Sequence, residues 1–145
     1  MKKIITAILL LTLMCTLLSF NALAAMPDDE IVMPLYNNTA TTNTTFTISS
    51  GGSAMVKVFY RGYSGVTTGG TKTTKIQKYV SGSWQDVDIG MPNNEWVDVS
   101  TSVFFTKTHT VQLQSTGIYR AVVEYVISGS GGSDDVINET VEYTY

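Results

Sequence analysis

The residues that could carry out nucleophilic or metal chemistry are few, because the chain has one histidine, His109, and one cysteine, Cys15. A catalytic triad needs a histidine within hydrogen-bond reach of a nucleophile and an orienting carboxylate. His109 lies between two threonines in a predicted strand, and the sequence has no Gly-x-Ser-x-Gly turn to present a serine. One histidine and one thiol cannot supply the usual ligands of a structural zinc site. We therefore predict a surface or rim histidine, no catalytic residue, no metal and no cofactor.

Two pairs of carboxylates were considered as candidate sites. Asp86 and Asp88 would point to one face of a strand, and Asp134 and Asp135 lie in a glycine-rich loop. No twelve-residue loop carries oxygen ligands at the spacing that calcium sites of the helix–loop–helix type use. A glycosidase would need two carboxylates facing each other across a cleft. We interpret these aspartates as solvated charges, of the kind that also protect strand edges.

The two tryptophans, Trp84 and Trp96, are the candidate ligand-binding residues. Each follows a predicted turn, where a flat aromatic ring can form a platform for a sugar ring, and an exported β-sandwich is a common host for such a platform. The alternative is that both rings pack in the core or at its rim, since large aromatic side chains dominate core burial.

Alternating hydrophobicity indicates the elements that must position these residues. The strongest signal is residues 117–127, where apolar side chains recur at every second position on one face. Similar alternation predicts strands at 44–49, 54–61, 72–80, 84–89 and 136–145. Residues 96–113 fit one long bent strand or two short ones, with Val97, Val99 and Phe105 on a common apolar face. No stretch after the first 25 residues shows helical periodicity.

Seven to eight short strands separated by turn signals predict an all-β fold. We expect an antiparallel immunoglobulin-like β-sandwich without a disulfide. A small closed β-barrel is the alternative.

The first residues have the pattern of a secretory signal peptide. Lys2 and Lys3 precede an apolar run at 4–18, and Ala22 to Ala24 form an A-x-A cleavage site. The run is shorter than the ~20 residues that a membrane-spanning helix needs. We predict a signal peptide at 1–24 that is cleaved after Ala24, a flexible Thr/Asn-rich segment at 25–43, and a single β-sandwich domain at 44–145. The product would be secreted, with no membrane span after signal removal.

Composition limits the partners. The net charge is −3, and loss of the two lysines would make it two units more negative. An acidic chain is a poor partner for nucleic acid or an anionic membrane. Charged residues form 14% of the chain, against about 25% in typical soluble domains.

Two motifs resemble known proteins. Gly117 to Arg120 resembles the tyrosine corner of immunoglobulin-like and fibronectin-III-like sandwiches, in which the tyrosine hydroxyl bonds nearby backbone. Ile76 to Lys78, followed by Gly82 to Trp84, resembles the hairpin of small secreted Gram-positive proteins of uncharacterised function. The resemblance covers 54–145 and implies a sandwich in which Tyr119 is structural. It implies no activity, and the inter-sheet disulfide of immunoglobulin domains proper is absent.

Three functions follow as hypotheses. The first is a secreted, non-catalytic module that binds a cell-surface glycan or protein through loops at one end of the sandwich. The second is a small secreted effector of the bacteriocin-like or toxin-like kind. The third is an extracellular hydrolase.

Overall fold

The computed structural model describes residues 36–145. The predicted signal peptide, its cleavage after Ala24 and the first part of the Thr/Asn-rich segment lie outside these residues. Within the described part of the chain, no helix is long and apolar enough to cross a membrane.

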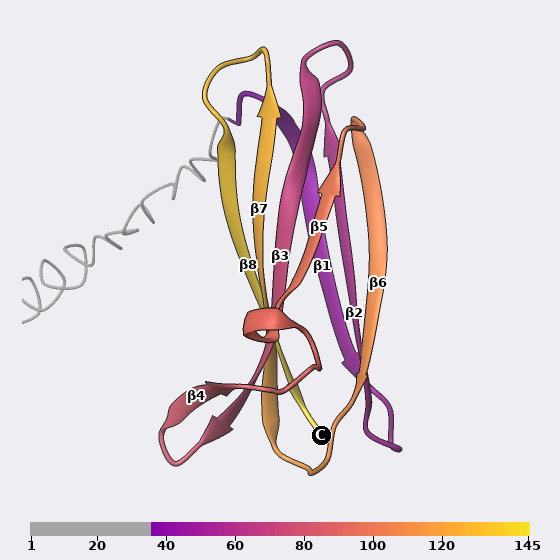
Figure 1. Ribbon diagram of the computed structural model, residues 1–145, viewed down its shortest axis with the longest axis vertical. Coiled ribbons are helices and arrows are strands. Elements are labelled where there is room, and N and C mark those ends of the chain that lie inside the picture. The colour runs from indigo at the N-terminus through magenta and orange to yellow at the C-terminus, as the bar shows by residue number, and fades with distance from the viewer. Residues whose placement is uncertain (1–35) are drawn as a thin grey trace, which may run out of the picture. The chain divides into compact units, whose positions relative to one another are not determined.

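Residues 36–145 form two antiparallel sheets that lie face to face (Figure 1). The three-stranded sheet has the order β1-β2-β6, and the five-stranded sheet has the order β4-β3-β7-β8, with β5 also paired to β3. One short 3-10 turn, η1 (Pro92–Asn94), precedes β5. The strands are β1 (Thr39–Ile48), β2 (Ser53–Gly62), β3 (Thr67–Val80), β4 (Ser83–Asp86), β5 (Trp96–Ser100), β6 (Phe104–Gln112), β7 (Ile118–Gly129) and β8 (Asp135–Thr144).

This strand order confirms the predicted all-β sandwich. No ladder joins the two sheets within the described residues, so the structure is not the closed barrel that was the alternative. β1, β2 and β6 occupy the places of strands A, B and E of an immunoglobulin-like Greek key, and β3, β7 and β8 those of C, F and G.

The core forms where alternating apolar residues of the two sheets meet. On β2 the even positions from 54 to 60 are completely buried, and on β7 the odd positions from 119 to 127 are at most 2% exposed. Both faces were predicted from the sequence, because burial follows hydrophobicity along these strands. The fully or almost fully buried residues that these strands contribute are Ala54, Val56, Val58, Tyr60, Tyr119, Ala121, Val123, Tyr125 and Ile127.

The predicted hairpin between β3 and β4 is also present. Val80 pairs with Ser83, so the connection is the two residues Ser81 and Gly82, both with positive φ. Two positive φ angles define a type I′ turn, whose twist matches that of the strands on either side. This hairpin projects away from the remaining strands in Figure 1.

β1 begins at Thr39, five residues before the strand that the sequence predicts. The buried carboxylate of Asp135 accepts hydrogen bonds from the backbone N–H groups of Asn37 (3.0 Å) and Asn38 (2.8 Å). The Asn38 side chain is buried in turn and donates to the Ser133 carbonyl at 2.9 Å. These bonds fix the start of β1 against the β7–β8 loop. Asp135 is therefore a structural residue, whereas the sequence indicated a solvated charge.

The orientation of β5 corrects the sequence analysis. Val97 and Val99 were expected on a core-facing apolar side, but they are 57% and 72% exposed and point outward. The inward side of β5 carries Trp96 and Asp98 instead. β5 and β6 are also two separate strands in different sheets, so the shared apolar face that was expected across 96–113 does not exist.

Tyr119, at the start of β7, has the geometry of a tyrosine corner. Its ring is 2% exposed, and its hydroxyl donates to the backbone carbonyl of Ser115 at 2.6 Å. The bond ties the β6–β7 connection to the first residues of β7.

We expect Tyr119→Phe to lower the free energy of unfolding by about 1 kcal/mol, because the Ser115 carbonyl loses its donor in a partly buried place. Urea denaturation measures the change. Tyr143 is the matched control, because it lies directly opposite Tyr119 on β8 and is 38% exposed. Tyr143→Phe should have the stability of the parent. Equal stability of Tyr119→Phe and the parent would contradict a stabilising corner.

Candidate functional site

Trp84 lies on the outward face of the five-stranded sheet. It pairs with Tyr79, which is 43% exposed, and the two rings are tilted at 5.1 Å between centroids. The guanidinium group of Arg120 lies 4.3 Å from the centre of the indole ring. The partly buried Trp84 ring is thus in contact with a cation, and it is not the free aromatic surface that the sequence suggested for a sugar ring.

Trp96 faces the other way. It pairs with Thr74, which is completely buried, so it points between the sheets. Its ring stacks on the imidazole of His109 at 4.7 Å between centroids and 7° between planes, and it packs against the core. The two tryptophans are therefore on opposite faces of the same sheet, and the structure does not bring them together into one site.

His109 lies on β6, at the open edge of the sandwich, and its side chain points toward β5 of the other sheet. Its Nε2 atom is 2.7 Å from Oδ2 of Asp98, and the His109 side chain is 9% exposed. The contact joins an edge strand of one sheet to an edge strand of the other. His109 thus contacts Asp98 through Nε2 and stacks its ring on Trp96. The contact with Asp98 joins the two sheets, and the sequence did not predict it.

A lysine lies in the core beside this contact. Lys72 is completely buried on β3, directly opposite Asp98 on β5. Its ammonium group lies 3.4 Å from the centre of the Phe105 ring and 5.1 Å from that of Tyr60, and it donates to the Gly70 carbonyl at 3.3 Å. Burial lowers the pKa of Lys72 from 10.5 to about 8, although the negative charge of Asp98 partly opposes this shift.

The aspartates that the sequence singled out lie in separate places and have separate partners. The Asp86 side chain accepts a hydrogen bond from Gln77 at 2.7 Å, and that of Asp88 accepts one from the backbone of Gly90 at 2.9 Å. Asp134 is exposed. Among residues 36–145, no three His, Cys, Asp or Glu side chains lie close enough to hold a metal ion.

The outward face of the three-stranded sheet is different in character, and we call it the β1–β2–β6 face. Backbone pairing arranges its side chains in four rows of three, with six threonines on the outer two strands and larger residues along β2. All are exposed except Phe59, which is partly buried. The rows are Thr41, Arg61 and Phe104; Asn43, Phe59 and Thr106; Thr45, Lys57 and Thr108; and Thr47, Met55 and Thr110.

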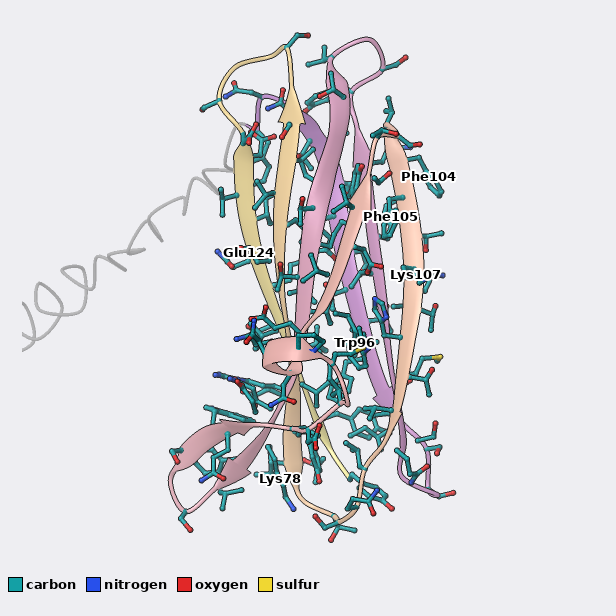
Figure 2. All side chains as sticks on the ribbon, in the orientation of Figure 1. Lys78, Trp96, Phe104, Phe105, Lys107 and Glu124 are labelled. Carbon is teal, nitrogen blue, oxygen red and sulfur yellow. The ribbon has the colours of Figure 1, made fainter. Side chains whose placement is uncertain are left out.

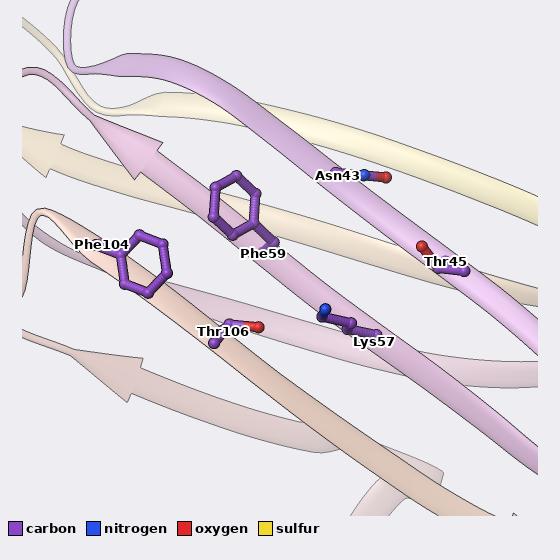
Figure 3. A pocket seen from close by; sticks show the side chains of 6 residues that line it. All are labelled: Asn43, Thr45, Lys57, Phe59, Phe104 and Thr106. Atoms are coloured by element: carbon purple, nitrogen blue, oxygen red, sulfur yellow. The ribbon is translucent and has the colours of Figure 1, made fainter.

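A groove of about 260 Å³ crosses the middle of this face (Figure 3). Phe59 and Phe104 lie edge to face, with 5.3 Å between ring centroids and 72° between planes. Phe104 is 54% exposed and lies on the opposite side of β6 from Phe105 (Figure 2). The remaining lining residues are Asn43, Thr45, Lys57 and Thr106.

The groove can hold part of a ligand. Its volume is below the ~300–1,000 Å³ of pockets that enclose a small molecule. Two aromatic rings at a steep angle to each other supply apolar contacts, while amide, hydroxyl and ammonium groups around them supply hydrogen bonds. This combination suits one or two units of an extended polar chain that lies across the sheet.

Comparison with protein-family models, curated proteins and solved structures finds no match.

The sequence analysis named neither Phe59 nor Phe104 as a candidate. The alternation along β2 places Phe59 opposite to the buried Val58 and Tyr60, so this signal was available for that ring. The outward position of Phe104 could not be predicted in this way, because its neighbour Phe105 is equally apolar. Only the pairing of β2 with β6 shows which of the two rings faces outward.

The buried lysine leads to a pH-dependent stability. Between about pH 8 and pH 10.5 the unfolded chain binds a proton at Lys72 that the folded chain has lost. Stability must therefore rise with pH across this window, by on the order of 3 kcal/mol. Burial raises the pKa of Tyr125 from 10.0 to about 12. Above pH 10 the unfolded chain therefore loses the phenol proton before the folded chain does, and the free energy of unfolding falls. We expect maximum stability at about pH 10.

Urea denaturation of the parent and of Lys72→Met at several pH values between 7 and 10.5 measures this effect. The variant removes the charge and keeps an unbranched apolar side chain, so its stability should not rise across the window. A parent whose stability is flat or falls between pH 8 and pH 10 would contradict a neutralised core lysine.

Proposed function

We propose that the chain is an extracellular, non-catalytic binding module whose ligand is a glycan held on the β1–β2–β6 face. The observation that carries the proposal is the contact between the partly buried Phe59 and the exposed Phe104 in a groove lined by hydrogen-bonding side chains. An extracellular location rests on the signal-peptide pattern of the first 24 residues.

The chemistry of the groove favours a sugar over a protein partner. A sugar ring has an apolar face that packs on an aromatic ring and hydroxyl groups that need partners around its edge. Phe59 and Phe104 provide the first contact, and Asn43, Thr45 and Thr106 provide the second. The core of a protein–protein interface needs a larger continuous apolar area, and on this face only the two phenylalanines and Met55 are large and apolar.

The proposal moves the binding site from the ends of the sandwich to a sheet face. The sequence-based hypothesis placed a ligand at end loops and on Trp84 or Trp96. The structure turns Trp96 inward, against His109. Trp84 stays partly exposed beneath Arg120 and serves as the competing site in the test.

Binding to an array of cell-wall and host polysaccharides tests this function. We expect Phe104→Ala to weaken binding of the retained polysaccharide by about tenfold, because the sugar loses an aromatic contact. More than half of the Phe104 side chain is exposed, so the variant should fold. Trp84→Ala is the control and should bind as the parent does.

Two outcomes contradict the proposal. Loss of binding in Trp84→Ala with full binding in Phe104→Ala would place the site on the five-stranded sheet. No retention of any polysaccharide by the parent would contradict glycan binding itself.

A further inference from the structure

We infer that the glycan is negatively charged, and that Lys57 and Arg61 each bind one of its acidic groups. This inference rests on the proposed function and specifies the class of glycan. It follows from the placement of two cations on the central strand of the β1–β2–β6 face.

The charges of Lys57 and Arg61 are not compensated within the described part of the chain. Both side chains are exposed, and neither is in an ion pair there. None of the twelve outward residues of the face is acidic. The face therefore carries two positive charges.

Most of the other described cations are already engaged. Lys72 is buried, Lys75 pairs with Glu95 at 2.8 Å, and Arg120 donates to Gln77 at 2.8 Å and lies over Trp84. The chain as a whole is acidic, with a net charge of −3. A locally positive face on an acidic protein attracts an anionic ligand to that face and disfavours it elsewhere.

The order of residues along β2 gives the ligand a pattern. Lys57, Phe59 and Arg61 are successive outward residues, so an aromatic ring lies between two cations. At ~3.3 Å per residue the backbone positions of the two cationic residues are about 13 Å apart along the strand. The spacing fits a polymer in which acidic groups recur on either side of a sugar ring.

Neighbouring groups can complete the binding of each acid. Thr45 and Thr108 flank Lys57 in its row, and Thr41 lies beside Arg61. Hydroxyl groups donate to carboxylate or phosphate oxygens, and a guanidinium group binds either anion with two parallel hydrogen bonds. Carboxylate and phosphate thus share one recognition chemistry on this face.

The test measures dissociation constants for four immobilised polymers at about 50 mM and about 300 mM NaCl. Polygalacturonate is a glycan that carries carboxylates, phosphomannan is a glycan that carries phosphates, dextran is a neutral glycan, and polyglutamate is an acidic chain without sugar. We expect one of the two acidic glycans to bind about tenfold more tightly than dextran at low salt, and its binding to weaken at high salt. Which of the two binds more tightly identifies the acid.

The variants separate local charge from net charge. Lys57→Gln combined with Arg61→Gln should weaken binding of the acidic polymer by about tenfold or more and flatten its salt dependence. Lys107→Gln is the control, because Lys107 is an exposed cation on β6 that points away from the face (Figure 2). It should change binding by less than about twofold. Both substituted side chains are exposed, and matching thermal unfolding of the double variant verifies that it folds.

The outcomes distinguish this inference from the function on which it rests. Dextran bound as tightly as the acidic polymers, with loss in Phe104→Ala, would overturn the anionic ligand and retain the glycan. Polyglutamate bound as tightly as the acidic glycans would retain the anion and overturn the glycan. Absence of binding to every acidic polymer at low salt, or equal binding by the double variant and the parent, would overturn the inference.

Discussion

A buried ammonium group is the constraint to which the open edge of the sandwich conforms. An unpaired charge in a core is costly, so Lys72 needs partners on every side. Phe105 and Tyr60 supply aromatic faces, Gly70 supplies a carbonyl, and Asp98 supplies the opposing charge from the next strand. For Asp98 to face inward, β5 must expose its valines. The same carboxylate lies 2.7 Å from Nε2 of His109 on β6, and this contact links the two sheets where no ladder joins them.

This constraint also shows where sequence reasoning succeeded and where it could not. The core faces of β2 and β7 were predicted because, along those strands, hydrophobicity alone decides which side is buried. On β5 the same rule predicts the wrong side, because the inward side carries Asp98, which contacts His109 and lies opposite Lys72, while two valines are exposed. The start of β1 was missed for another reason. It depends on the contact of Asn38 with Asp135, 97 residues away along the chain, and no local pattern reports a contact of that length.

In the candidate site, too, the sequence predicts some features and not others. Alternation along β2 is enough to place Lys57, Phe59 and Arg61 on one outward line. The partners of that line come from β1 and β6, and only the register of the two ladders shows that Phe104 lies beside Arg61 and next to Phe59. Register also separates the two tryptophans, because Trp96 pairs with a buried residue and Trp84 with an exposed one. Residue types identify the chemistry that is available, while strand pairing decides which groups act together.

The strict alternation of β2 has an evolutionary consequence. Val56, Val58 and Tyr60 are completely buried and stabilise the fold, whereas Lys57 and Arg61 on the same strand are exposed and are the residues that we propose bind the ligand. Mutations at the outward positions leave the interior unchanged, so selection can act on recognition and on stability separately within a stretch of a few residues. The small threonines on either side leave space for larger or differently charged side chains. Under the proposed function, a lineage that carries this sandwich would change what it recognises by exchanging side chains on one face, without a change of fold.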